Sequence, residues 1–185
     1  MHIDVSSGIV KEARQQMSPN CDDRPSEIDI SLIVIHGISL PPGKFGGDYI
    51  DQLFCNKLNP NEHPYFKEID GLKVSSHLLV RRDGEVVQYV PLQKRAWHAG
   101  VSCYENRDCC NDYSIGIEME GEDETPYTDI QYQVLADLIK TLIKSYPDLS
   151  EKTIAGHCDI APDRKTDPGE AFDWERLNKL AFKGF

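Results

Sequence analysis

The sequence lacks an excess of positive charge, and this lack excludes one large class of partners. Its 20 Lys and Arg residues stand against 31 Asp and Glu residues, which gives a formal net charge of −11 at pH 7. A chain of this sign repels the phosphate backbone of nucleic acids. We therefore expect no nucleic-acid partner, and any anionic ligand must meet a local group of cationic side chains.

Long hydrophobic runs are also missing. No segment approaches the roughly 20 apolar residues of a membrane-spanning helix, and the opening MHIDVSSGIVKEARQQ lacks the basic and apolar regions of a signal peptide. We therefore expect a cytoplasmic protein without a membrane partner. In a reducing compartment thiols normally stay free, and we expect this for the six cysteines, which form no C-x-x-C pair: Cys21, Cys55, Cys103, Cys109, Cys110 and Cys158.

Internal repeats, low-complexity tracts and linker-like segments are absent too. The 185 residues, with 39% hydrophobic and 28% charged side chains, have the composition of a globular chain. A length in the range of ~100–200 residues suits a single domain. We predict one domain over residues 1–185, with a monomer as the expected state.

Short apolar segments predict the strands of one sheet. Residues 32–35 are a β-branched run, typical of a strand that is covered on both faces, and His36 follows at its end. Residues 77–90 hold an Asp-Gly turn between two apolar runs, which predicts a β-hairpin. Residues 114–120 alternate, so that one face feeds the core with Ile115, Ile117 and Met119 and the other presents Gly116, Glu118 and Glu120.

Helical patterns occupy the last third of the chain. Apolar residues recur at helical spacing from Ile130 to Tyr146, and Thr128 with Gln131 matches a capping box at the start of this helix. Asp173 can cap a final helix. Between the two helices we expect a short strand over residues 153–157 and an irregular loop over 158–169. The predicted fold is α+β, a central mixed β-sheet flanked by helices.

Two of the predicted strands end in histidines. These are His36 and His157, and Asp167 follows the second one ten residues later. A catalytic zinc ion usually takes three protein ligands from His and carboxylate side chains and keeps its fourth position for water. The three residues would suit such a site. Spacing alone does not distinguish it from two histidines with satisfied hydrogen bonds in the core or on the surface.

Six segments, quoted in order, carry a more specific signal: ISLPPGKFGG, HPYF, RRDGEVVQYVP, KRAWHAGVS, CNDYSIGIEMEG and GHCDIAPDRKTDPG. Over roughly residues 30–178 they resemble the AmpD-type anhydro-muramoyl-peptide amidases of the zinc amidase and peptidoglycan-recognition superfamily. The resemblance implies an amidase-like fold. It also implies a cytosolic enzyme of peptidoglycan recycling that cuts the amide between 1,6-anhydro-N-acetylmuramic acid and L-alanine, so an anhydro-muropeptide is the expected partner.

The resemblance further implies a Zn²⁺ cofactor held by His36, His157 and Asp167. Other side chains of the same loop compete for the third ligand position on chemistry alone. The motif KTDPG favours Asp167 over these rivals, which are Asp159, Asp163 and Cys158.

Amide hydrolysis also needs a proton carrier, and a carboxylate near the metal can take this role. Alternation along the strand leaves Glu118 and Glu120 equivalent, whereas the family pattern SIGIE selects Glu118, with Gly116 leaving room beside it. Lys165 resembles the family residue that stabilises the negative oxygen of the tetrahedral intermediate. Its simpler interpretation is an exposed lysine in a charged loop.

The carboxylates of a muropeptide stem would need local cations, for which Lys73, Arg95 and Arg107 are candidates. The family places the Trp97-His98 block beside the cleft, where it could contact the sugar. A structural Trp and a hydrogen-bonded core His explain these two residues equally well.

Three positions depart from the family pattern. Gly37 stands where Asn is common, Cys109 where an arginine is frequent, and Lys73 where an arginine is usual. We expect these changes to affect affinity or stem-peptide preference. Two alternative functions stay open: a peptidoglycan-recognition module without catalysis and an exported cell-wall amidase. By family analogy, loss of the enzyme could raise β-lactamase induction in a host with that circuit.

Overall fold

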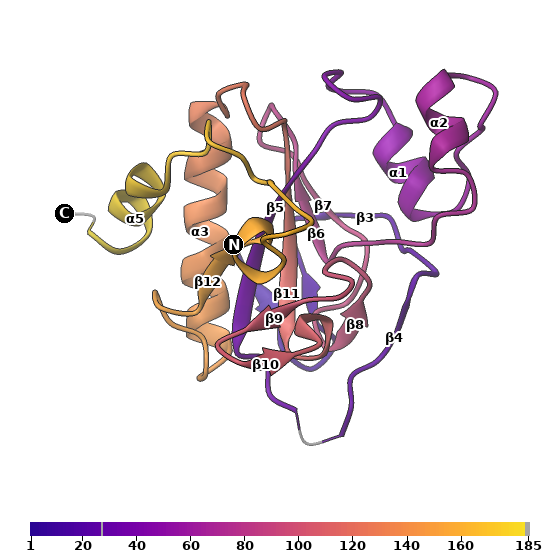
Figure 1. Cartoon of the computed structure of the whole chain (residues 1–185). Coiled ribbons are helices and arrows are strands. Elements are labelled where there is room, and N and C mark those ends of the chain that lie inside the picture. Colours follow the sequence, from indigo (N-terminus) through magenta and orange to yellow (C-terminus); the bar gives the residue numbers. More distant parts are fainter. Residues whose placement is uncertain (27, 184–185) are drawn as a thin grey trace.

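A six-stranded sheet runs through the middle of the molecule in the computed structural model of Figure 1, which describes residues 1–26 and 28–183. The strand order is β12 (Ile154–Gly156), β5 (Leu32–Ile38), β11 (Ser114–Glu120), β6 (Leu78–Val80), β7 (Val86–Gln88) and β3 (Arg14–Gln15). In this order the first four strands are mutually parallel, the fifth is antiparallel to the fourth, and the last two are parallel to each other. The prediction of a mixed sheet is therefore confirmed.

One face of this sheet is covered by the long helix α3 (Asp129–Ser145), and α5 (Trp174–Phe182) packs against α3 (Figure 1). The predicted capping box is present: the Thr128 hydroxyl accepts a hydrogen bond from the Gln131 N–H at 3.3 Å, and the Gln131 amide oxygen accepts one from the Thr128 N–H at 3.0 Å. The inner side of α3 packs on alternate residues of β5, β11 and β6. This layer forms the largest apolar core, as the alternation in residues 114–120 predicts.

The opposite face carries short elements and long loops. Helices α1 (Tyr49–Phe54) and α2 (Pro64–Glu68) lie away from α3 in Figure 1 and bury a second apolar cluster against β6 and β7. No periodic pattern in the sequence predicts these two helices. The sequence patterns also miss several very short pairs: β1 (Ile3–Asp4) with β2 (Ile9–Val10), β4 (Cys21–Asp23) with β8 (Lys94–Ala96), and β9 (Cys103–Tyr104) with β10 (Arg107–Asp108).

The prediction of an irregular loop over residues 158–169 is wrong at its start. Residues His157–Ile160 form the short helix α4 directly after β12. The Asp159 carboxylate accepts a hydrogen bond from the Gly156 N–H at 2.7 Å, and this bond closes the first turn. His157 therefore starts a helix and does not end a strand. The helix turns the chain back toward β5, which brings the following loop to the end of the sheet.

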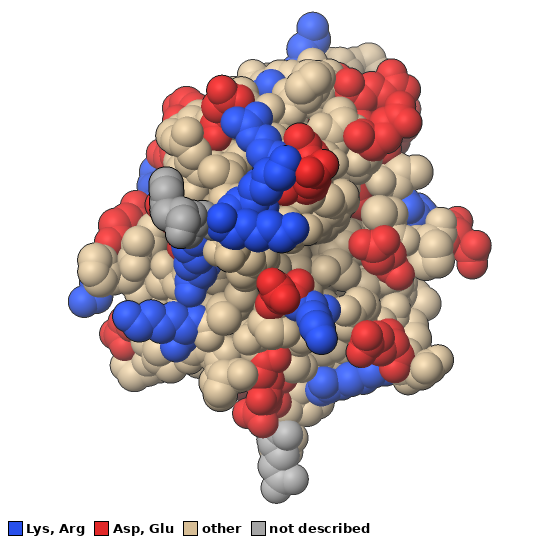
Figure 2. Space-filling view, turned by 90° about the vertical axis from the view of Figure 1, so that its left-hand side faces the viewer, with Lys and Arg blue, Asp and Glu red and all other residues tan. Residues whose placement is uncertain are grey.

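The surface mixes charges of both signs. On the side of the molecule that Figure 2 shows, basic and acidic side chains alternate, and the basic ones gather in its upper part. Ion pairs such as Arg176 with Asp129 at 2.7 Å connect α5 to the start of α3. None of the described helices is long and apolar enough to cross a membrane. All six cysteines are free thiols, as expected.

Candidate active site

A cleft of about 720 Å³ opens at the carboxyl ends of the parallel strands β5 and β11. Its floor contains His36, which lies near the carboxyl end of β5, and His157, which directly follows β12, because parallel strands bring their ends to one edge of the sheet. One wall is apolar and comes from the loop after β5, from α1 and from the segment after α2. That wall includes Leu40, Leu53, Phe54, Ile69 and Leu72. Three acidic residues, here called the acidic rim, also line the cleft: Glu122, Asp123 and Glu124.

Three side chains converge on one point in the floor of the cleft. The Nδ1 atoms of His36 and His157 lie 2.9 Å apart, and the Asp167 Oδ2 atom lies 3.3 Å from the first and 3.0 Å from the second. Both histidines are almost fully buried. Residues 121 positions apart along the chain are thus brought together. Within the described residues no other His, Cys, Asp and Glu side chains form such a group.

The donor set fits a divalent metal ion such as zinc. Zinc bonds to His nitrogen and carboxylate oxygen measure ~2.0–2.2 Å, so ligand atoms in a tetrahedral site lie roughly 3.3 Å apart. The separations of 2.9, 3.3 and 3.0 Å between the three atoms are close to this value. The rival Asp159 is engaged elsewhere, because its carboxylate caps the start of α4.

Burial also prepares these groups as ligands. It lowers the pKa of His36 from 6.5 to about 4, although the neighbouring Asp167 carboxylate opposes this shift. Burial alone would raise the pKa of Asp167, yet its close contacts with His157 and His36 outweigh this effect and hold the pKa below its ordinary value. At neutral pH His36 is therefore neutral and Asp167 is ionised, which are the forms that bind a metal ion.

Glu118 lies beside this group. It is the register partner of His36 on the neighbouring strand, it is 8% exposed, and it lines the cleft. No described residue donates a hydrogen bond to its carboxylate. Burial, followed by the nearby charge of Asp167, raises the pKa of Glu118 well above its ordinary value, and the Lys165 ammonium opposes this shift. Lys165 also lines the cleft, so both residues predicted for proton transfer and oxyanion stabilisation meet there.

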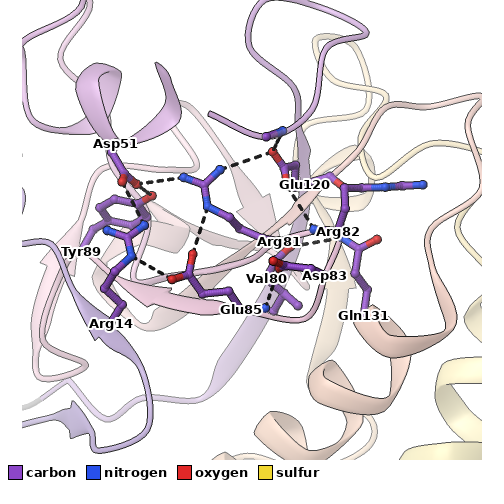
Figure 3. A network of polar contacts seen from close by, with 11 residues as sticks. Arg14, Asp51, Val80, Arg81, Arg82, Asp83, Glu85, Tyr89, Glu120 and Gln131 are labelled. Atoms are coloured by element: carbon purple, nitrogen blue, oxygen red, sulfur yellow. Dashed lines mark hydrogen bonds and ion pairs between the residues drawn. The ribbon is translucent and has the colours of Figure 1, made fainter. Parts of the chain in front are cut away.

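Glu120, two residues further along β11, is held by a separate polar network (Figure 3). Its carboxylate accepts hydrogen bonds from the Gly46 N–H at 2.6 Å and the Arg82 N–H at 3.0 Å, and it pairs with Arg81 at 3.4 Å. The Arg81 guanidinium continues to Asp51 on α1. Glu120 is thus a buried, bonded carboxylate that fastens the loop after β5 to the sheet, which leaves Glu118 as the free one.

His98 reaches the same centre from the loop after β8. Its Nδ1 atom lies 2.8 Å from the Nε2 atom of His36, and its Nε2 atom lies 3.1 Å from the Ser114 hydroxyl. Both ring nitrogens therefore bond to protein atoms, although the ring edge lines the cleft. The prediction that Gly116 leaves room beside Glu118 needs correction: a Cβ at Gly116 would lie 2.6 Å from the His98 ring, so the glycine makes room for His98.

The remaining residues predicted to bind substrate lie outside the described lining of the cleft. Arg95 is paired with Asp22 and Asp112 at 2.7 and 2.8 Å. The Arg107 guanidinium lies 3.7 Å above the Tyr113 ring. The Trp97 side chain is half-buried. Lys73 lines a smaller hollow of about 150 Å³ that shares Leu53, Ile69 and Leu72 with the cleft. Their roles stay predictions.

Gly37 and Cys109, two of the three departures from the family pattern, have distinct environments. A Cβ at Gly37 would lie 2.6 Å from the Tyr127 hydroxyl, which donates a hydrogen bond to the Pro168 carbonyl. The backbone N–H of Gly37 points to Asp167 at 3.4 Å. Cys109 is exposed and adopts a left-handed conformation with φ of 60°. A phenol therefore occupies the space that a side chain at position 37 would need.

Sequence reasoning missed several residues of the site. The acidic rim follows β11 directly as the run Gly121-Glu122-Asp123-Glu124, a charged stretch that could have marked a cleft edge. Tyr127, Ser114 and Asn111 carried no such signal, because isolated polar and aromatic residues occur throughout globular chains.

Comparison with known proteins agrees with this geometry. The family described as N-acetylmuramoyl-L-alanine amidase matches residues 26–170. The chain is 59% identical over 173 residues to the 1,6-anhydro-N-acetylmuramyl-L-alanine amidase AmpD of Salmonella typhimurium strain SL1344, covering 94% of this chain and 92% of the relative. It is 57% identical over 179 residues to the AmpD of Escherichia coli strain K12, covering 97% of each chain.

Solved structures give the same result. A crystal structure of a selenomethionine AmpD derivative superposes with a TM-score of 0.94 at 56% identity, covering 97% of this chain and 99% of that one. The complex of the amidase AmiD from E. coli with anhydro-N-acetylmuramic acid-L-Ala-D-γ-Glu-L-Lys matches with a TM-score of 0.58 at 28% identity, covering 93% of this chain and 60% of that one. The chain therefore belongs to the N-acetylmuramoyl-L-alanine amidase family, an enzyme family that hydrolyses an amide bond.

Proposed function

We propose that this protein is a zinc-dependent amidase that cuts the bond between 1,6-anhydro-N-acetylmuramic acid and L-alanine in anhydro-muropeptides. One observation carries the proposal: His36, His157 and Asp167 converge beside the buried, unbonded carboxylate of Glu118. The AmpD relatives have this activity in their names at up to 59% identity. The AmiD relative was solved with such a muropeptide.

His36 and His157 would hold the zinc ion through Nδ1 and Asp167 through Oδ2. Three protein ligands leave one coordination position for water or substrate. When bound, zinc lowers the pKa of water to about 7 and polarises a carbonyl group. The rest of the reaction falls to the side chains that face this position.

Glu118 would accept a proton from the attacking water and pass it to the leaving nitrogen of L-alanine. Its raised pKa suits both steps, because a carboxyl group whose pKa lies nearer to neutral pH can also act as an acid. The Lys165 ammonium would stabilise the negative charge that develops on the former carbonyl oxygen. A single loop delivers Lys165 and Asp167 to the same centre.

The shape and surroundings of the cleft suit a sugar-peptide ligand. Its apolar wall offers contact area for the sugar ring, and Lys73 in the adjoining hollow could meet a carboxylate of the stem peptide. The proposal places the enzyme in cytoplasmic peptidoglycan recycling as a monomer. Consumption of anhydro-muropeptides would also reduce β-lactamase induction in a host that has this circuit.

The test is hydrolysis of a purified anhydro-muramoyl tripeptide, followed by chromatography of the released stem peptide. We expect release by the zinc-loaded protein, loss of release after chelation, and recovery when zinc is added back. Asp167→Ala should lose bound zinc and activity together. Asp163→Ala, which removes an exposed carboxylate from the same loop, is the matched control and should retain both.

Three results would contradict the proposal. Binding of the muropeptide without any release of stem peptide would indicate a recognition module. Release that survives complete removal of the metal ion would exclude the metal-dependent mechanism. Faster release from intact cell-wall polymer than from the anhydro-muropeptide would indicate an exported cell-wall amidase.

A further inference from the structure

We propose that His98 and Ser114 position His36 for metal binding by fixing which of its ring nitrogens carries the proton. The inference rests on the metal site of the proposed function but concerns residues that never touch the ion. His98 is therefore a positioning residue here, in place of the substrate contact that the sequence analysis predicts.

The contacts form an unbroken chain inside the protein. The His36 Nε2 atom lies 2.8 Å from His98 Nδ1, and His98 Nε2 lies 3.1 Å from the Ser114 hydroxyl. The Ser114 hydroxyl in turn donates to the Cys110 carbonyl at 2.5 Å. The three side chains of this chain are at most 9% exposed, so water does not replace these partners.

The direction of every hydrogen bond in this series follows from its last acceptor, the Cys110 carbonyl. A carbonyl oxygen only accepts, so the Ser114 hydroxyl gives its proton to Cys110 and accepts from His98 Nε2–H. The neutral His98 ring then has a bare Nδ1, which accepts from His36 Nε2–H. This leaves the His36 Nδ1 atom without a proton and directed at His157 and Asp167. A histidine that binds a metal ion through Nδ1 needs this tautomer.

The surrounding backbone is built to hold the His98 ring in place. The Asn111 side-chain oxygen accepts from the N–H groups of His98 and Ala99 at 3.1 and 2.8 Å. The ring itself lies against the Cα of Gly116, where any side chain would collide with it. The His98 segment is thus held by Asn111 and its ring by Gly116. Such fixed placement suits a residue that orients another side chain.

The same segment also faces the second histidine. The Ala99 carbonyl lies 3.4 Å from the His157 Nε2 atom, while the Nδ1 atom of His157 points to the centre of the site. His98 therefore contacts the Nε2 atom of His36, and the Ala99 carbonyl contacts the Nε2 atom of His157. This arrangement explains why the loop after β8 lies so close to the ends of β5 and β12.

The decisive variants distinguish the effect of losing the His98 Nδ1 acceptor from the effect of losing the ring. His98→Phe retains a ring but removes both nitrogens, Ser114→Ala removes the second link, and His98→Asn retains an acceptor near the Nδ1 position. Zinc affinity is measured by competition with a chromophoric chelator. We expect a 10- to 100-fold weaker affinity for His98→Phe, a smaller loss for Ser114→Ala, and partial rescue in His98→Asn.

Ser76→Ala is the matched control, because Ser76 is also fully buried and donates to a backbone carbonyl in the same sheet. It should bind zinc as the unchanged protein does. Thermal unfolding of each metal-free variant shows whether a loss of zinc affinity exceeds the loss of stability. Zinc affinities of His98→Phe and Ser114→Ala within twofold of the control would overturn the proposal.

A second measurement does not depend on any variant. Long-range proton–nitrogen NMR spectra of the zinc-loaded protein report the tautomer of each imidazole. We expect His36 and His98 both to carry their proton on Nε2, and a proton on Nδ1 of His98 would refute the assignment. Zinc affinity and the tautomers are both measured in the absence of substrate. A failure of amide hydrolysis would therefore contradict the proposed function and leave this inference intact.

Discussion

The two faces of the central sheet bury different kinds of side chain, although the same strands form both faces. On β11, Ile115, Ile117 and Met119 pack under α3 in a purely apolar layer, whereas Glu118 and Glu120 of the same strand lie on the other face. Both faces are buried. The α3 face gains stability from burial, while the site face buries titratable groups at a cost that only specific partners offset.

The site face is itself divided. Glu120 has three partners in the network of Figure 3, and His98 has two. Glu118 has none among the described residues, although its exposed fraction of 8% lies between those of Glu120 and His98. A buried carboxylate without partners destabilises the fold, and such strain is found where a side chain must react. The comparison therefore separates polar residues that support the site from the residue that acts in it.

The largest effect should come from Glu118→Gln. We expect turnover to fall by roughly 10²–10⁴-fold, because the proton carrier is lost. The free energy of unfolding should stay the same or rise, because the buried charge is removed. Its matched control is Glu120→Gln, which should lose stability and retain turnover. Steady-state kinetics and denaturant unfolding measure the two quantities, and full turnover in Glu118→Gln would reverse our assignment.

On the α3 face we expect the reverse of the Glu118→Gln result: a substitution there should reduce stability and leave turnover unchanged. Leu138 is fully buried in the centre of the apolar core. Leu138→Ala should reduce the free energy of unfolding by about 2–5 kcal/mol, from lost burial and the remaining cavity. Zinc affinity and turnover at a temperature where the variant is folded should not change. A variant with normal stability, or with a selective loss of zinc, would show that the two faces are not separate.

The smallest effect concerns the pH dependence of stability on the site face. Burial, followed by the charge of Arg24, lowers the pKa of His77 on the site face from 6.5 to about 3. A histidine with a lowered folded pKa stabilises the fold fully above pH 6.5, and this contribution declines as the pH falls toward 3.

Metal-free protein should therefore lose stability by about 1.4 kcal/mol per pH unit for this one group between pH 6 and 4. His77→Asn retains an acceptor for the Gly116 N–H and should show a shallower slope, whatever its stability at neutral pH. Urea unfolding at several pH values gives both slopes. Equal slopes would mean that His77 is not the group that titrates.

The elements with strong periodicity could be predicted from the sequence. The α3 helix, its capping box, the Asp-Gly hairpin and β11 are confirmed close to their predicted bounds. These features depend on local chemistry and on burial of one face. The short strands predicted at the two histidines are present as β5 and β12, but their pairing, with β5 between β12 and β11, is not contained in the local patterns.

Other features depend on contacts that no local pattern contains. Strands of two or three residues, such as β3 and β8, exist because a neighbouring strand accepts their hydrogen bonds. Arg95 looks like a ligand-binding cation in the sequence, yet it pairs with Asp22 and Asp112 from distant segments. The position of His98 follows from Asn111 and Gly116, which the sequence does not mark as its neighbours.

The close approach of Gly37 and Tyr127 has a consequence for how this sequence can diverge. A side chain introduced at position 37 collides with the phenol, while loss of the phenol hydroxyl first leaves the Pro168 carbonyl without its hydrogen bond. We therefore expect the two positions to change together: a side chain at position 37 should be tolerated better in a protein in which Tyr127 has already been replaced. Directed evolution that samples one substitution at a time should reach an asparagine at position 37 less easily than a library that varies both positions.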